Sequence, residues 1–370
     1  MALPDLKLDQ ADVPRLLRDT TADPGFVRLL REMGISLIAG IRPGAIGCFG
    51  AADRALTVSC TPVTIPLGMA TDGTRIAVGS RRDITIFAPS TRLAEHLPGN
   101  PGYYDVVYVP VSLYRTGECM VHDMALDGPS VLFTNTQFSC LCRADGFSSF
   151  VPLWQPPFIS ALLPQDRCHL NSFATDAGRV RYATAFATSD TRQGYRDRPI
   201  DSGVLIDVEA NAVVVTGLIK PHSVRIFDQK VYVLNSAAGE VLLVDVAARG
   251  AQTLARLPGF TRGLRMWGDV LFVGLSTLRA SAQSLDLPLR RHADPLIAGI
   301  AALDRGSGRL LGLLRLPAGV EELFDFVVIP GPQRPLVLDP APDAPAIGIE
   351  TPTGSYWMKT RPDLVPGAKD

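Results

Sequence analysis

The sequence predicts an all-β fold, a single β-propeller of about six four-stranded blades, from two observations. After Gly34, short runs rich in β-branched residues alternate with turn residues such as Asp-Gly and Gly-Asp, and helical periodicity nearly vanishes. A pattern of four short strands then recurs at spacings of roughly 40 to 60 residues, and a period of ~40–50 residues is typical of propeller blades. The copies begin near Leu67, His122, His169, His222, Arg262 and Glu321.

The two ends of the repeat decide how the ring closes. We expect the C-terminal copy to pair with strands from residues 35–61 and so to complete a blade. Five or seven blades also fit, because the first and last copies are poorly marked. A pair of β-sandwiches is the competing architecture, but it does not predict recurring copies.

The first 34 residues differ from the rest of the chain. Pro24 stands where a helix would begin and Gly34 where it would end. We therefore expect one or two short helices over residues 1–34, packed on a propeller that spans 35–345, with a C-terminal tail over 346–370. The apolar residues at helical spacing are Leu16, Leu17, Phe26, Leu29 and Leu30.

Composition narrows the class of partner. The 36 basic and 37 acidic residues give a net charge of −1, and no Lys/Arg run stands out, so nucleic acid is not an expected partner. No apolar run reaches the ~18–20 residues that span a bilayer, so no membrane association is expected. The N-terminus lacks the pattern of a signal peptide and the six cysteines form no disulfide framework, which favours the cytoplasm. The oligomeric state is left open.

Three of the five histidines occupy equivalent places in the repeat. His122, His169 and His222 each stand at the start of an inferred innermost strand, in three successive blades. Innermost strands line the channel of a propeller, so these imidazoles are expected to meet near its axis. Neutral imidazole is a common ligand of Fe, Zn, Cu and Ni, and also a proton-transfer group. Taken singly, each histidine is better explained as a hydrogen-bonded structural group. The three equivalent places together predict a shared metal or acid–base site.

Charged residues near the same positions extend this hypothesis. Glu321 or Glu322 is expected as a fourth metal ligand, with a strand cap or an ion pair to Arg262 as the alternative. Asp123 follows His122 and is expected to orient a neighbouring imidazole. Arg225 and Arg262 are candidates for binding a substrate carboxylate, although ion pairs between blades explain them equally well. Further candidates for supporting contacts are Asp166, Arg167 and Asn171.

Seven motifs carry a family resemblance: NTQFSCL (135–141), WQPPFIS (154–160), DRCHLNS (166–172), PHSVR (221–225), LNSAAGE (234–240), LPGFTRGL (257–264) and VGLSTLR (273–279). Together they resemble a family of bacterial proteins, DUF4915, which has no established general function. The resemblance covers most of residues 35–335 and implies histidines in three motifs, here His122, His169 and His222. The sequence departs from the family pattern at Ser172, where glycine is expected, and at Val224, where proline is common.

The function that these observations favour is a metal-dependent enzyme with one transition-metal ion in the channel. Fe(II) is the first choice for a site rich in imidazole with open positions, and Zn, Mn, Ni or Cu also fit. The expected reaction is an oxidation, or alternatively a lyase or isomerase step, on a small molecule or a peptide side chain. The competing hypothesis is a non-catalytic propeller that binds a peptide or a partner protein. No G-x-S-x-G, Walker A, G-x-G-x-x-G or H-E-x-x-H motif is present.

Overall fold

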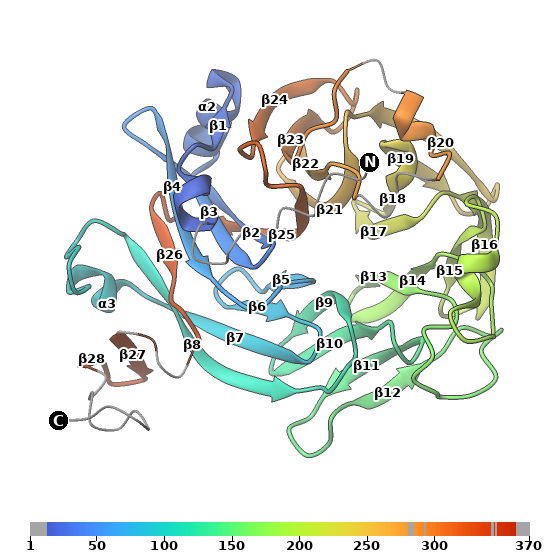
Figure 1. Ribbon diagram of the computed structural model, residues 1–370, viewed down its shortest axis with the longest axis horizontal. Coiled ribbons are helices and arrows are strands. Elements are labelled where there is room, and N and C mark those ends of the chain that lie inside the picture. Colours follow the sequence, from blue (N-terminus) through green and yellow to red (C-terminus); the bar gives the residue numbers. More distant parts are fainter. Residues whose placement is uncertain (1–12, 280–284, 292–293, 342–343, 345, 360–370) are drawn as a thin grey trace, which may run out of the picture.

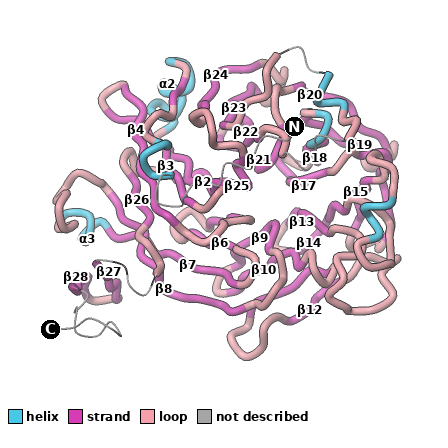
Figure 2. Tube along the Cα trace, viewed as in Figure 1, coloured by secondary structure: helices cyan, strands magenta, loops and turns pink. Residues whose placement is uncertain are grey.

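Six antiparallel sheets stand around a central channel in the computed structural model, as the ribbon in Figure 1 shows. The structure describes residues 13–279, 285–291, 294–341, 344 and 346–359. Strands and loops make up nearly all of the ring, and the few short helices lie at its periphery (Figure 2). The predicted all-β propeller is confirmed, and the number of blades is six.

The blades follow one another along the chain, and each begins with its innermost strand. Blade 1 contains β5 (Met69–Thr71), β6 (Ile76–Gly79), β7 (Asp83–Ser90) and β8 (Val106–Arg115), and blade 2 contains β9 (Val121–Asp127), β10 (Ser130–Asn135), β11 (Cys140–Ala144) and β12 (Val151–Trp154). Blade 3 contains β13 (Leu170–Asp176), β14 (Arg179–Ala185), β15 (Gly203–Asp207) and β16 (Ala212–Leu218), and blade 4 contains β17 (Pro221–Phe227), β18 (Lys230–Asn235), β19 (Glu240–Asp245) and β20 (Gly250–Arg256). Blade 5 contains β21 (Phe260–Trp267), β22 (Val270–Ser276), β23 (Gly299–Asp304) and β24 (Leu310–Arg315).

Blade 6 closes the ring by joining the two ends of the propeller. Its innermost strand is β25 (Glu322–Pro330), and its outer three come from the N-terminal part: β2 (Ile35–Arg42), β3 (Ala45–Ala52) and β4 (Ala55–Pro62). The pairing of β2 with β25 is antiparallel and brings Ile38 opposite Val327. The predicted closure through residues 35–61 is therefore correct.

Period-two alternation explains how the blades pack on each other. Along β22, Val270 and Phe272 join the core shared with blade 6, whereas Leu271 and Val273 join the core shared with blade 4. Successive strand residues point to opposite faces, and both faces of a blade are covered by neighbours. The middle strands therefore read as continuous apolar runs in the sequence.

The N-terminal helices lie where the sequence predicts them. Helix α1 spans Val13–Leu17, and α2 spans Pro24–Met33, with proline in its first turn and Gly34 in a left-handed conformation (φ 60°) as its C-cap. Phe26 of α2 is fully buried and contacts Phe272 edge-to-face, with ring centroids 6.1 Å apart. Between the helices, β1 (Thr21–Ala22) adds a short fifth strand to blade 5, which the sequence does not predict.

The C-terminal region is more ordered than the tail that the sequence suggests. Strand β26 (Pro335–Val337) adds to β8 in parallel, and β27 (Ala346–Thr351) and β28 (Gly354–Lys359) form a hairpin beside α3 (Thr91–Glu95). The indole Nε1 of Trp357 donates to the Leu93 carbonyl at 3.0 Å. Short 3₁₀ turns occur at Gly194–Asp197, Ser236–Ala238 and Pro288–Arg291. In the part of the chain that the structure describes, no helix is long and apolar enough to cross a membrane.

Candidate functional site

The three predicted histidines gather at the end of the channel where the innermost strands begin. His122 is the second residue of β9, His222 is the second residue of β17, and His169 directly precedes β13. Their rings belong to an arc of contacts that includes two phenylalanines. Along this arc, ring centroids are 5.1 Å apart for His122–His169, 4.3 Å for His169–Phe186, 5.4 Å for Phe186–His222 and 5.4 Å for His222–Phe260. We call this arc and the residues around it the channel mouth.

Hydrogen bonds fix the tautomer of two of these imidazoles. The Nδ1 atom of His122 lies 2.8 Å from the Met120 carbonyl and 2.9 Å from the Thr136 hydroxyl, which itself donates to the Leu170 carbonyl. A carbonyl oxygen only accepts, so Nδ1 carries the hydrogen and Nε2 keeps its lone pair. The neutral rings are thus held with Nε2 as the free acceptor or ligand atom.

The same arrangement recurs two blades further on. The Nδ1 atom of His222 lies 2.9 Å from the Lys220 carbonyl and 2.8 Å from the Ser236 hydroxyl. Met120 and Lys220 both adopt a positive φ (55° and 51°), which places each carbonyl beside the imidazole two residues later. The Nε2 atom of His222 is buried and has no hydrogen-bond partner in the described part of the chain.

Burial keeps both rings neutral. It lowers the pKa of His122 to about 3, with the nearby His169 as a second cause, and lowers the pKa of His222 well below its usual value, with Arg262 as the second cause. At neutral pH these imidazoles therefore accept hydrogen bonds or bind cations through Nε2.

His169 has a different partner. Its Nδ1 atom lies 3.0 and 3.1 Å from the two carboxylate oxygens of Asp166, and its side chain is 15% exposed. Burial alone would raise the pKa of Asp166, but His169 and the hydroxyl of Tyr195 stabilise the carboxylate and lower that pKa overall. His169 itself has φ 52° and packs against the rings of Phe186 and Tyr195, which also contact each other with centroids 6.0 Å apart. A carboxylate in this position orients the imidazole.

A cluster of arginines lies at the mouth around blades 5 and 6. Glu322 is buried and pairs with Arg262 at 3.3 Å, Arg279 at 2.6 Å and Arg42 at 3.2 Å, which lower the pKa of its carboxyl although burial opposes them. Arg262 stacks on Phe260 and Phe324, and its Nε atom is buried without a partner in the described residues. Three guanidinium groups therefore share one carboxylate.

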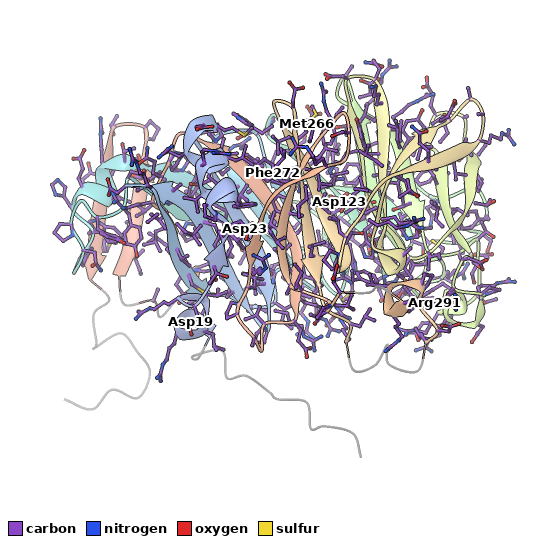
Figure 3. The ribbon with its side chains drawn as sticks, turned by 90° about the horizontal axis from the view of Figure 1, so that it is seen from above. Asp19, Asp23, Asp123, Met266, Phe272 and Arg291 are labelled. Atoms are coloured by element: carbon purple, nitrogen blue, oxygen red, sulfur yellow. The ribbon has the colours of Figure 1, made fainter. Side chains whose placement is uncertain are left out.

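A second polar layer lies deeper on the same strands. Asp123 accepts two hydrogen bonds from Arg225, both at 2.8 Å, and Asp325 accepts one from Arg265 at 2.9 Å. Asp123 lies inside the disc in the side view of Figure 3. We call these four residues the ion-pair layer. A cavity of about 10 Å³ lies between this layer and the mouth and has room for one group the size of a water molecule. Its lining includes Asp123 and Asp325 of the ion-pair layer and His122, His222, Arg262 and Phe324 of the mouth.

These contacts correct part of the predicted site. Asp123 orients no imidazole, because it is bound by Arg225 and by the backbone N–H groups of Met124 and Phe173. Arg225 was expected to bind a substrate carboxylate, but its guanidinium is occupied by Asp123. Glu322, an expected ligand, is held by the arginine cluster, and Glu321 is exposed.

Within the described residues, the structure does not bring His122, His169, His222 and a glutamate together as one metal-binding group. Among the residues that it describes, no three His, Cys, Asp or Glu side chains form a group that could hold a metal ion. Phe186 contacts both His169 and His222, so the arc of rings is not purely imidazole.

Sequence reasoning missed several residues of the mouth: Phe186, Tyr195, Lys220, Phe260, Phe324, Arg42 and Arg279. Tyr195 and Phe186 belong to the long β14–β15 connection, which carries no repeat signal, and they reach His169 only through the fold. Lys220 was overlooked although it stands two residues before His222, as Met120 stands before His122. The position two residues before a channel histidine was therefore the sequence signal that could have identified Lys220.

The fold and the site together define a six-bladed β-propeller with a histidine-lined channel mouth. The chain belongs to the family described as Domain of unknown function (DUF4915), whose model matches residues 24–338. No curated protein matches the chain. The fold is similar to that of a chain in the crystal structure of a nidogen/laminin complex, with a TM-score of 0.52 and 13% identity over 80% of this chain and 99% of that one. A protein of unknown function from Bacteroides caccae has a TM-score of 0.49 and 8% identity, with the same coverage.

Proposed function

We propose that the protein is an enzyme of the acid–base type, a lyase or isomerase that acts on a small molecule at the channel mouth. The Asp166–His169 pair is the proposed proton-transfer group. The observation that carries this proposal is the position of His169, whose Nδ1 is bound by both carboxylate oxygens of Asp166 while the ring remains partly exposed. His169 Nε2 then takes a proton from the substrate, and Asp166 stabilises the imidazolium that forms.

His122 and His222 have a different role in this scheme. Their Nδ1 atoms are bound to acceptors, so their Nε2 atoms accept hydrogen bonds and orient the substrate beside His169. Since burial keeps them neutral, they do not compete with His169 for the proton.

The test uses a mixture of small metabolites, because the substrate is unidentified. Wild-type protein and the His169→Asn variant are each incubated with a cell metabolite extract, and mass spectrometry follows which compounds disappear. Asparagine preserves a donor towards Asp166 but has no basic nitrogen, so we expect consumption to fall by about 10²–10⁴-fold. His96→Asn, an exposed histidine on the outer side of blade 1, is the matched control.

Two results would overturn the proposal. Equal consumption by wild-type protein and His169→Asn would remove His169 from the chemistry. Consumption of no compound by the wild-type protein would favour the alternative hypothesis, a non-catalytic propeller that binds a peptide or partner protein.

A metal-dependent oxidation is the second candidate, and one observation favours it. All three histidines donate Nδ1–H to a carbonyl or a carboxylate, which is the usual support of metal-binding imidazoles, and Nε2 would be the ligand atom. Fe(II) is the metal that we would expect first, then Zn, Mn, Ni or Cu. Metal analysis of untagged protein tests it: one transition metal per chain, lost in His122→Ala and in His222→Ala, would replace the acid–base proposal.

A further inference from the structure

The channel mouth carries more positive charge than its carboxylates neutralise. Glu322 is shared by three arginines. Lys220, directly before β17, takes part in no ion pair within the described residues. Burial and then the nearby Arg196, Arg262 and Arg279 lower the pKa of its ammonium group. These cations lie beside neutral imidazoles, in a protein whose net charge is −1. An excess of positive charge at one end of a channel attracts anions.

Two buried atoms at the mouth determine which hydrogen-bonding groups a ligand there would have to supply. Arg262 Nε is a donor and His222 Nε2 is an acceptor, and neither has a partner in the described part of the chain. Two further residues that line the cavity also carry an unpartnered buried atom, the donor Asn171 Nδ2 and the acceptor Asp325 Oδ1. His222 is only 5% exposed, and both residues line the small cavity above the ion-pair layer. A buried donor or acceptor without a partner costs about 1–3 kcal/mol. A ligand that supplies a hydroxyl group to this cavity would satisfy either atom.

We propose that the mouth binds a small anion that carries a hydroxyl group, such as an α-hydroxy acid or hydrogen phosphate. The hydroxyl enters the cavity and donates to His222 Nε2, and the anionic oxygens lie among Lys220, Arg262 and Arg279. The cavity admits only a group the size of a hydroxyl, so the rest of the ligand stays in the mouth, within reach of the Asp166–His169 pair. This assignment rests on the proposed function and names the class of its substrate.

Calorimetric titrations with defined anions test the proposal. The probes are glycolate, acetate and inorganic phosphate, with chloride at the same ionic strength as the reference. Glycolate and acetate differ by one hydroxyl, so we expect glycolate to bind about tenfold more tightly than acetate. Phosphate separates the two ligand classes: tighter binding of phosphate than of glycolate identifies a phosphate ligand, and the reverse identifies a hydroxy acid.

The cation contribution is tested with a matched pair of lysine variants. Lys220→Met removes the unpaired ammonium at the mouth, whereas Lys230→Met removes an exposed lysine at the start of β18, at the opposite end of the β17–β18 hairpin. We expect Lys220→Met to weaken binding of the tightest anion at least tenfold and Lys230→Met to leave it unchanged. His222→Phe should abolish the preference for glycolate over acetate.

The outcomes distinguish this inference from the proposed function. Equal effects of the two lysine variants, or no anion binding above chloride, would overturn the anion site, while turnover that depends on His169 could still hold for a neutral substrate. Conversely, anion binding that depends on Lys220, without turnover of any compound, would leave the site as a binding site and remove the enzyme.

Discussion

The channel mouth and the ion-pair layer use the same innermost strands for opposite purposes. In the ion-pair layer, each charged group has an opposite charge within 3 Å: Asp123 with Arg225, and Asp325 with Arg265. At the mouth, three arginines share Glu322, and Lys220 has no carboxylate partner among the described residues. One layer is neutralised by the protein and the other is not.

This difference in charge pairing indicates which part of the channel can bind a ligand. The ion pairs of the deeper layer join blade 2 to blade 4 and blade 5 to blade 6, so they connect the innermost strands and fill the channel. At the mouth, by contrast, Arg262 Nε and His222 Nε2 are buried without a hydrogen-bond partner in the described residues, and both residues line the small cavity. The predictions below test this division, because it assigns stability to one layer and binding to the other.

The largest expected effect is on the ion-pair layer. Asp123→Ala leaves the guanidinium of Arg225 buried without a counter-charge, so we expect a loss of about 3–5 kcal/mol in the free energy of unfolding. Urea denaturation measures it. The comparison variant at the mouth is Arg279→Met, whose partly exposed side chain should contribute less than about 1 kcal/mol.

A double variant checks the cause. Asp123→Ala combined with Arg225→Met removes both charges and should be more stable than Asp123→Ala alone. If Asp123→Ala and Arg279→Met destabilised the protein equally, the assignment of stability to the deeper layer would be wrong.

The fold was predictable because each blade carries its own signal. Four short strands and their turns lie within one stretch of about 50 residues, so the repeat is visible without knowledge of long-range contacts. The β26–β8 and β1–β24 pairings were not predictable. Each involves only two or three residues that are far from their partner strand in the sequence.

The division between the two layers depends on β-bulges, which the regular alternation of side chains along a strand does not predict. His222 and Arg225 are three residues apart and would point to opposite faces of a regular strand. The structure has a shift in register between them, with Ser223 at φ 50°, and the equivalent shift in β21 follows Arg262, with Gly263 at φ 72°. Because of these bulges, His222 and Arg262 reach the channel at the mouth, and Arg225 and Arg265 reach it in the deeper layer.

A smaller effect is expected from protonation at the mouth. The pKa of His222 lies well below its usual value in the folded protein because of burial, whereas the unfolded chain titrates near 6.5. Below pH 6.5 the unfolded state therefore binds more protons, and the folded state loses stability as the pH falls. We expect a loss of about 1.5 kcal/mol between pH 6.5 and 5 from a histidine that stays neutral in the folded state, because the unfolded chain is already half protonated at pH 6.5.

Urea denaturation of EDTA-treated protein at a series of pH values measures this loss. His222→Gln should reduce the dependence in that window, because glutamine does not titrate, while the buried His122 keeps its own contribution. The exposed His96, replaced by Gln, is the control and should leave the slope unchanged. An unchanged slope in His222→Gln would mean that the ring is not held neutral by burial.

The smallest expected loss of stability comes from a residue that supports a histidine of the mouth from behind. Thr136 accepts from His122 Nδ1 at 2.9 Å and donates to the Leu170 carbonyl at 2.7 Å, so its hydroxyl links blade 2 to blade 3. Thr136→Val keeps the shape but removes both bonds, and we expect a loss of about 1–2 kcal/mol in the free energy of unfolding. Thr74→Val, in the exposed turn between β5 and β6, is the matched control and should cost less than about 0.5 kcal/mol.

The same variant tests what fixes the tautomer of His122. The Met120 carbonyl still accepts from His122 Nδ1 in Thr136→Val, so the pattern of imidazole ¹⁵N shifts should stay that of an Nδ1–H ring. A switch to the Nε2–H pattern would show that the hydroxyl, and not the carbonyl, fixes the acceptor at the mouth.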